Sequence, residues 1–285
     1  MKRLHVDSRV RVDSRPRDAH RGETPMNTKT LIPLLAMSFG LTWTIAAILI
    51  FFYDRVVAVF GELTIANPLY ILAVYSPGLA GLLLVWRHHG GEGVRRFLRR
   101  LTLWRAPLGW WAFLVLGVPA VVYTGAAIKG SITDPLPFSG WQQALSALAL
   151  ALFLGPIEEF GWRGVALPIL QRRFAPLWAG MILGTIIAVW HIPAFFISGA
   201  PMNSWSFAPY FGGVIAIYVI LTPFFNAARG SLLVAYLYHF QMMNPVFPDA
   251  QPWDNILWIV VAIVVVWWKR DAMFDRGSAV TEVLS

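Results

Sequence analysis

The hydrophobic positions of this chain form long runs that are separated by short polar segments. Eight runs are long enough to predict helices that cross a bilayer, at 31–53, 68–87, 107–128, 143–170, 175–197, 208–225, 229–244 and 254–268. The run at 143–170 is the least regular because it contains charged residues, and the last two runs are short. The pattern predicts an all-α, polytopic bundle of about eight transmembrane helices in the cell membrane.

The polar segments at the two ends of the chain predict tails. Residues 1–30 are basic, and the first 25 contain no apolar stretch with a cleavage site, so we expect a disordered cytoplasmic tail rather than a signal peptide. Met26 opens a shorter and more ordinary amino terminus, which suggests an alternative start of the chain. We expect the bundle to span 31–270 and a short cytoplasmic tail to follow at 271–285.

Composition and charge support a membrane location. Hydrophobic residues make up 57% of the chain and charged residues only 13%, whereas a soluble domain carries about 25% charged residues. The net charge of +8 would suggest nucleic acid in a soluble protein, but the basic residues fall in alternate connections between the runs. Their distribution predicts cytoplasmic termini and no nucleic-acid partner. The absence of cysteine excludes disulfides and thiolate chemistry.

Candidate chemistry begins with charged residues inside the fourth run, where ionisable groups are costly and usually functional. Residues four apart share one helix face, so Glu159 and Arg163 can form an ion pair. Glu158 is rotated about 100° from Glu159 and has no local partner. Such a carboxyl can act as a general base or acid. We therefore expect Glu158 to carry chemistry and the Glu159–Arg163 pair to support the site.

Two histidines, His191 and His239, lie in later apolar runs. At 1.5 Å per helical residue, Glu158 and His191 lie roughly 21 Å and 24 Å from the cytoplasmic ends of their helices, and His239 lies roughly 15 Å deep. All three can therefore meet at middle depth. Either histidine alone would more simply be a hydrogen-bonded packing residue. A lone Glu–Arg pair could be a structural ion pair that stabilises helix packing. The conjunction favours a catalytic site.

The metal question stays open at this level. Two histidines and a glutamate form an acceptable catalytic zinc set, here Glu158, His191 and His239. The chain lacks the His-Glu-x-x-His helix of common metallopeptidases, and we favour no cofactor. A transporter with a midplane site would be expected to show inverted repeats or paired broken helices, and the sequence shows no such pattern.

The motif Glu158-Glu159-x-x-x-Arg163, followed by a histidine late in the next run and another in a later run, resembles the CPBP family. That family comprises type II CAAX prenyl endopeptidases and bacteriocin-processing or self-immunity (Abi) proteins. The resemblance covers about 143–245 and includes two further stretches, 170–174 and 229–233. It implies an intramembrane endopeptidase that acts on a peptide or protein substrate; whether that substrate is prenylated, and the oligomeric state, stay open.

The resemblance also implies roles for the site residues. Glu158 would activate a water with help from His191, and His239 would stabilise the oxyanion with a nearby Asn, without a metal. The sequence departs from the family pattern at Met243, where the family has Asn or Asp, and Asn244 follows one residue later. At Ile187 the family usually has Phe. The alternative is a catalytically silent immunity or binding protein of the same fold.

Overall fold

The computed structural model describes residues 26–64 and 67–284. Secondary structure in these residues is helical, and no strand occurs among them. Six helical stretches are long and apolar enough to cross a membrane: Thr28–Phe51, Pro68–Thr102, Leu108–Lys129, Trp141–Gln171, Pro176–Phe196 and Phe207–Ala227. The protein is therefore an all-α, multi-pass integral membrane protein, and the predicted fold class is confirmed.

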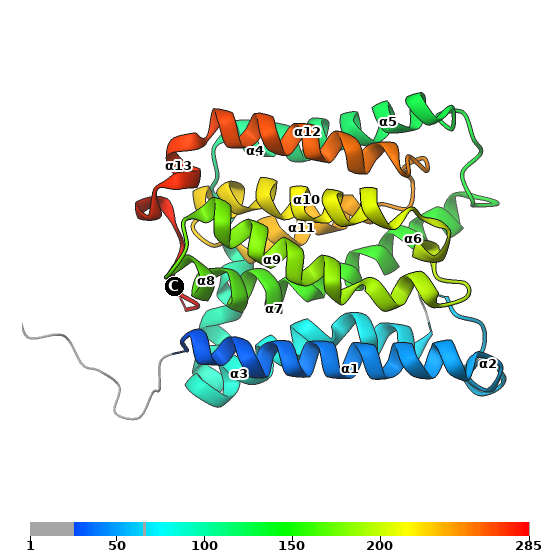
Figure 1. Ribbon diagram of the computed structural model, residues 1–285, viewed down its shortest axis with the longest axis horizontal. Coiled ribbons are helices and arrows are strands. Elements are labelled where there is room, and N and C mark those ends of the chain that lie inside the picture. Colours follow the sequence, from blue (N-terminus) through cyan, green and yellow to red (C-terminus); the bar gives the residue numbers. More distant parts are fainter. Residues whose placement is uncertain (1–25, 65–66, 285) are drawn as a thin grey trace, which may run out of the picture.

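The α-helices follow one another along the chain with few long connections. They are α1 Leu31–Phe51, α2 Tyr53–Phe60, α3 Pro68–Arg99, α4 Leu108–Ala112, α5 Val118–Lys129, α6 Trp141–Phe153, α7 Glu159–Gly161, α8 Leu167–Gln171, α9 Pro176–Trp190, α10 Phe207–Ala227, α11 Leu232–Met242, α12 Trp253–Trp268 and α13 Arg270–Phe274. The long helices lie side by side, and α10 packs against both α9 and α12 while α1 packs against α3 (Figure 1).

The predicted count of eight spans is not confirmed. The last two predicted runs correspond to α11 with 11 residues and α12 with 16 residues. At 1.5 Å per residue these helices are about 16 Å and 24 Å long, shorter than the roughly 30 Å hydrocarbon core of a bilayer. The helix α11 ends inside the bundle, where residues 243–252 continue as turns and irregular chain. The orientation of the termini remains a prediction.

The fourth predicted run corresponds to one membrane-capable stretch, Trp141–Gln171, but this stretch is not a regular α-helix throughout. After α6 the backbone leaves helical geometry at Leu154 (φ −87°, ψ −82°) and enters a 3-10 turn, Gly155–Glu158. The short α7, a π turn at Trp162–Ala166 and α8 follow. Pro156 has no N–H to donate to a continuous helix, which favours a break at this place. Glu158 therefore lies at the end of a tight turn.

The broken segment is held by close contact between its backbone and that of α3. A Cβ atom on Gly161 would lie 2.1 Å from the carbonyl oxygen of Pro77, and one on Gly78 would lie 2.4 Å from the carbonyl oxygen of Ile157. Only glycine permits this approach, because any side chain would push the two backbones apart. The turn that carries Glu158 is therefore packed tightly against α3.

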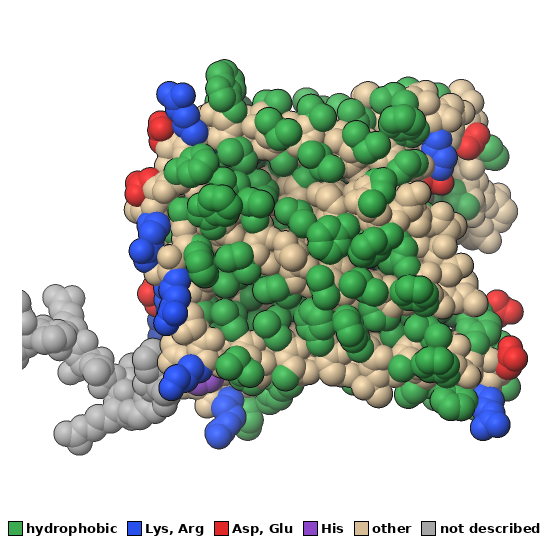
Figure 2. All heavy atoms as spheres, viewed as in Figure 1, with side chains coloured by type: hydrophobic (Ala, Val, Ile, Leu, Met, Phe, Trp, Pro, Cys, Tyr) green, Lys and Arg blue, Asp and Glu red, His purple; other side chains and the backbone are tan. Residues whose placement is uncertain are grey.

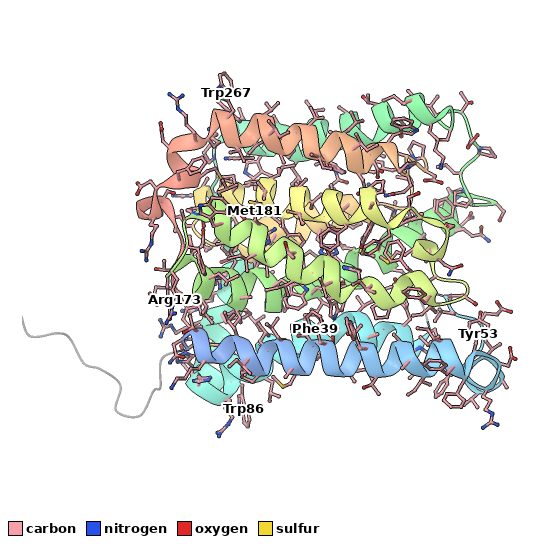
Figure 3. The ribbon with its side chains drawn as sticks, in the orientation of Figure 1. Phe39, Tyr53, Trp86, Arg173, Met181 and Trp267 are labelled. Atoms are coloured by element: carbon pink, nitrogen blue, oxygen red, sulfur yellow. The ribbon has the colours of Figure 1, made fainter. Side chains whose placement is uncertain are left out.

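The surface of the bundle separates by polarity. Hydrophobic side chains cover the middle of the face in view, and Lys, Arg, Asp and Glu lie mostly at the two ends (Figure 2). The indole side chains of Trp86 and Trp267 point away from the bundle and are 57% and 73% exposed (Figure 3). Arg173 lies at the end of the bundle opposite to Tyr53 (Figure 3). An apolar belt between two charged ends fits a lipid-facing surface.

The structure describes most of the predicted carboxyl-terminal tail but only the end of the predicted amino-terminal tail. Residues 1–25 of the predicted amino-terminal tail lie outside the described residues, whereas Met26 is buried and its carbonyl accepts a hydrogen bond from Arg172. The carboxyl-terminal segment packs on the bundle. Arg100 donates to the carbonyl of Val283 at 2.9 Å, and Gln171 donates to that of Val280 at 2.8 Å. The segment 279–284 is therefore part of the folded bundle.

Candidate functional site

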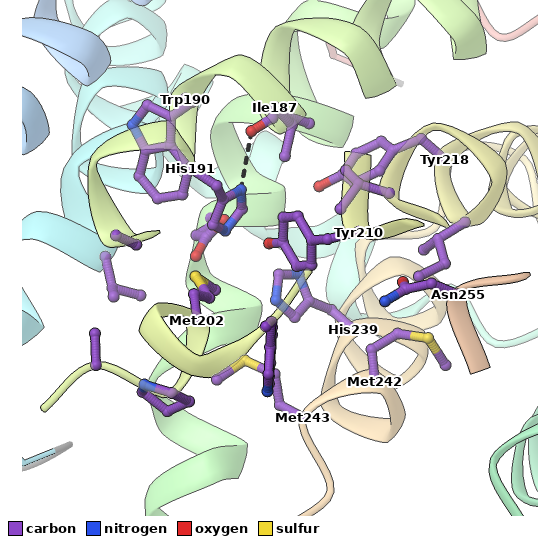
Figure 4. A pocket seen from close by; sticks show the side chains of 18 of the residues that line it. Ile187, Trp190, His191, Met202, Tyr210, Tyr218, His239, Met242, Met243 and Asn255 are labelled. Carbon is purple, nitrogen blue, oxygen red and sulfur yellow. Dashed lines mark hydrogen bonds between the residues drawn. The ribbon is translucent and has the colours of Figure 1, made fainter. Parts of the chain in front are cut away.

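A cavity of about 490 Å³ lies within the bundle and brings the predicted residues together. Glu158, His191, His239 and Asn244 all line it, although they come from four separate segments. Figure 4 shows His191 and His239 in this cavity with the ring of Tyr210 between them. The meeting of these side chains agrees with the depths expected from the sequence, while their individual roles stay proposals.

Glu158 has a buried carboxyl group. The residue is 4% exposed, and its Oε2 atom has no hydrogen-bond partner among the described residues. The helical rotation used in the sequence argument does not apply across the 3-10 turn. The two glutamates still differ as expected, because Glu159 has partners in the bundle whereas Oε2 of Glu158 has none. The wall of the cavity therefore contains a buried carboxyl group with one oxygen that no protein donor satisfies.

Glu159 has more partners than the sequence predicted. Its Oε2 atom lies 3.4 Å from Nε of Arg163, so the predicted ion pair is present. Its Oε1 atom accepts from the hydroxyl of Tyr218 at 3.0 Å and is 2.9 Å from Nδ1 of His239. Glu159 therefore connects Arg163, α10 and α11, and it orients a histidine 80 residues away in sequence.

Arg163 is fully buried and is held from several sides. It donates to the hydroxyl of Thr222 and to the backbone carbonyl of Tyr218, each at 3.2 Å. Its guanidinium also lies 4.2 Å from the centre of the Tyr218 ring. Burying a guanidinium is costly unless its charge and its donors are matched. The carboxylate of Glu159 is the counter-ion of this guanidinium. The pair is therefore part of the buried structure next to the cavity, which Glu159 lines.

His191 and His239 are each fixed through Nδ1. His191 follows the last residue of α9, and its Nδ1 is 2.9 Å from the carbonyl oxygen of Ile187, which can only accept. His191 therefore carries its proton on Nδ1, and Nε2 is left as an acceptor. In His239, Nδ1 faces the Glu159 carboxylate in the same way. His191 lies within the membrane-capable stretch Pro176–Phe196, at the junction between the end of α9 at Trp190 and the 3-10 turn Ile192–Phe196.

Asn244 lines the cavity, but its amide is engaged locally. The amide donates to the side chain of Gln241 at 3.0 Å and accepts from the backbone of Val246 at 3.2 Å. Met243 occupies the place four residues after His239. A Cβ atom on Gly155 would lie 1.9 Å from the sulfur of Met243 and 3.1 Å from Nε2 of His239. The Met243 thioether and the His239 ring therefore sit directly above the turn that carries Glu158.

Two comparisons with known proteins show what this segment is similar to. The family described as type II CAAX prenyl endopeptidase Rce1-like matches residues 140–244, the segment that contains all of these side chains. A protein of Methanococcus maripaludis named CAAX prenyl protease 2 is 23% identical over 221 residues, which cover 70% of this chain and 81% of that protein. Both comparisons support the resemblance to the CPBP family that the motif indicated. They support a membrane-embedded peptide hydrolase that is similar to CAAX proteases.

The cavity has further lining residues that the sequence reasoning missed. Tyr70, Tyr210, Trp258 and Asn255 also line the cavity, and Asn255 is only 3% exposed. A Cβ atom on Gly213 would lie 2.1 Å from the side-chain oxygen of Asn255, so a glycine on α10 makes room for this amide. Asn255 is a polar residue early in an apolar run, and that exception was the available signal.

The candidate zinc set does not converge. Within residues 26–64 and 67–284, no group of three or more His, Cys, Asp or Glu side chains could hold a metal ion. Glu158, His191 and His239 share one cavity, but the acidic partner that reaches His239 is Glu159. No step proposed below involves a metal.

Proposed function

We propose that this protein hydrolyses peptide bonds within the membrane by means of a water molecule activated by Glu158. The observation that carries the proposal is the carboxyl of Glu158, which lies in the cavity wall with one oxygen that has no protein partner. Every other buried charge near it, on Glu159 and Arg163, has a partner in the bundle. Glu158 is thus the carboxyl that is free to take a proton from water.

His191 assists by holding the same water. Its Nδ1–H is committed to the carbonyl of Ile187, so Nε2 presents a lone pair on the other side of the ring. A water that donates one hydrogen to Glu158 and the other to His191 directs an oxygen lone pair at the substrate carbonyl. Positioning of this kind lowers the entropic part of the barrier before any bond changes.

The reaction can be written with these groups alone. The water oxygen forms a bond to the carbonyl carbon while its proton passes to Glu158, and the carbonyl oxygen becomes an oxyanion. Collapse of the tetrahedral intermediate breaks the C–N bond, and Glu158 returns the proton to the leaving amine. The products are a carboxylic acid and an amine, and Glu158 is restored.

His239 is proposed to stabilise the oxyanion. Its Nδ1 bond to Glu159 holds the ring, and the negative carboxylate favours the doubly protonated form, in which Nε2 donates into the cavity. Asn244 lines the same cavity and is proposed as a second donor. Its amide would first have to leave Gln241, so we expect its contribution to be smaller than that of His239.

The proposal is tested by cleavage of a quenched-fluorescent peptide library, with and without a farnesylated cysteine, by the purified protein in detergent. We expect cleavage by the wild type, none by Glu158→Gln, and wild-type cleavage by Glu62→Gln, which alters an exposed glutamate outside the cavity. Cleavage that persists in Glu158→Gln would refute the assigned role. No cleavage by any folded variant would support a silent binding protein instead.

A further inference from the structure

The cavity extends from the middle of the bundle to one of its two ends. Its deep wall includes Tyr218, Leu221 and Tyr238. Its outer wall is formed by the last turns of α1, the first turn of α3, the segment after α9 and the segment before α12, with Leu49, Tyr70, Met202 and Gln251 as examples. All four segments lie at the end of the bundle opposite to the start of α1 and to the carboxyl terminus (Figure 1).

The other end of the bundle is closed by packed side chains. Between Glu158 and that end lie Trp162, Arg163, Leu167 and Gln171, each with 0% exposure. Arg100 seals the same end, since it is 1% exposed and donates to backbone carbonyls of three separate segments, at Gly164, Gly230 and Val283. At the opposite end, the cavity is bounded by helix ends and irregular segments and not by such packing.

The two ends differ in charge. The closed end is formed by the start of α1, the end of α3, the connections that precede α4, α9 and α11, and α13 (Figure 1). These segments carry most of the basic residues in the described chain: Lys29, Arg95, Arg96, Arg99, Arg105, Arg172, Arg173, Arg229, Lys269, Arg270 and Arg276. The end with the cavity mouth carries Arg55 and Lys129, and Lys129 is paired with Asp249 at 2.6 Å. Lysine and arginine accumulate on the cytoplasmic side of membrane proteins. By this rule the closed end is cytoplasmic, and the mouth opens outside the cytoplasm.

We propose that the substrate is an extracytoplasmic peptide segment, from an exported or membrane protein, that reaches Glu158 from the outer face of the membrane. This inference rests on the proposed function and adds the side of entry. The walls are largely apolar, with Met202, Trp205 and Trp258 among them, so the segment is expected to present an apolar side chain beside the scissile bond. A prenylated tail made in the cytoplasm would meet the closed end.

The natural absence of cysteine makes the side of entry directly measurable. Three single-cysteine variants suffice. Asn203→Cys is at an exposed position between the lining residues Met202 and Trp205, Met243→Cys is inside the cavity, and Arg173→Cys is at the closed end. In intact spheroplasts of a bacterial host, a small membrane-impermeant methanethiosulfonate should label the first two and spare the third. Arg173→Cys should be labelled only after permeabilisation.

Labelling of Met243→Cys only from the cytoplasmic side would overturn the proposal. If Met243→Cys does not fold, Met202→Cys at the outer wall replaces it with the same expectation. The labelling needs no catalysis, so Glu158→Gln in the Met243→Cys background should label equally. This separates the side of entry from the proposed function.

A second measurement uses activity. Right-side-out vesicles should cleave an added impermeant peptide that the detergent-solubilised protein cleaves, and inverted vesicles should not, with Glu158→Gln inactive in both. Cleavage confined to inverted vesicles would refute outer entry and leave the peptidase intact. Absence of cleavage even in detergent would refute the peptidase, while the cysteine labelling would still decide the side of entry.

Discussion

The adjacent glutamates 158 and 159 offer a sharp test, because the structure assigns them opposite kinds of environment. Changing Glu159 to Gln removes the carboxylate that lies 3.4 Å from Nε of Arg163 and accepts from Tyr218 and His239 at 3.0 Å and 2.9 Å. Gln retains one oxygen, so one of the two hydrogen bonds can survive. The charge on Arg163, which has 0% exposure, then has no counter-ion.

The expected loss follows from burial. Removing one partner of a buried ion pair costs about 3–5 kcal/mol, because the remaining charge stays uncompensated in a medium of low dielectric constant. An exposed pair would cost at most about 1 kcal/mol, and neither side chain of this pair exceeds 2% exposure. We therefore expect Glu159→Gln to lower the free energy of unfolding by about 3–5 kcal/mol.

Glu158→Gln is the matched control one residue away. The Oε2 atom of Glu158 has no hydrogen-bond partner in the described protein, so the amide breaks no bond there. We expect the free energy of unfolding to change by less than about 1 kcal/mol while cleavage is lost. Glu159→Gln should retain measurable cleavage at temperatures where it is folded, because Glu158 is intact.

Unfolding is measured in mixed detergent micelles by intrinsic fluorescence. The 14 tryptophans give a strong signal, and thiol-reactive dyes cannot be used because the chain has no cysteine. Cleavage is measured on the same samples. The reasoning is refuted if Glu158→Gln destabilises as much as Glu159→Gln, because Glu158 would then carry a structural partner. It is also refuted if Glu159→Gln leaves stability unchanged.

Three further predictions concern packing, the closed end and metal. Gly161→Ala should lower the free energy of unfolding by about 1–3 kcal/mol, because its Cβ would lie 2.1 Å from the carbonyl oxygen of Pro77. Gly40→Ala should not destabilise, since nothing lies within 4 Å of its Cβ position. Equal unfolding midpoints for the two variants would contradict this. Arg100→Met should release the segment 279–284 and speed cleavage after Glu282 by a glutamate-specific protease, whereas the exposed Arg99→Met should not. Unchanged digestion would contradict the role of Arg100 in holding this segment. Dialysis against a chelator should leave cleavage intact; a loss that zinc restores would overturn the metal-free mechanism.

Much of the fold could be predicted because bilayer crossing depends on local composition. A run of apolar residues such as 31–53 or 208–225 has to be helical in lipid, since each backbone polar group needs an internal partner. The helices α1 and α10 therefore lie where the runs predicted. Length alone did not decide the last two runs, because α11 stops at Met242 and the chain continues as turns past Asn244, which lines the cavity.

The candidate site could be predicted in part. The i, i+4 spacing indicated the Glu159–Arg163 pair, and helical rise indicated that Glu158 and the two histidines reach a similar depth. The bond between Glu159 and His239 could not be predicted, because it joins residues 80 positions apart through the packing of α11 against the broken fourth segment. Asn255 entered the cavity for a similar reason, since α12 reaches it through the gap that Gly213 leaves on α10.

The sequence by itself determined the class of the protein, the order of its helices and the identity of the unusual charged residues, because hydrophobic length and local spacing are properties of neighbouring residues. Only the tertiary structure decided which glutamate is left free, which nitrogen of each histidine faces the cavity and which end of the bundle is closed. These features depend on hydrogen bonds and contacts between segments that are distant in the chain, and the energy of a buried charge is set by the partners that folding brings to it.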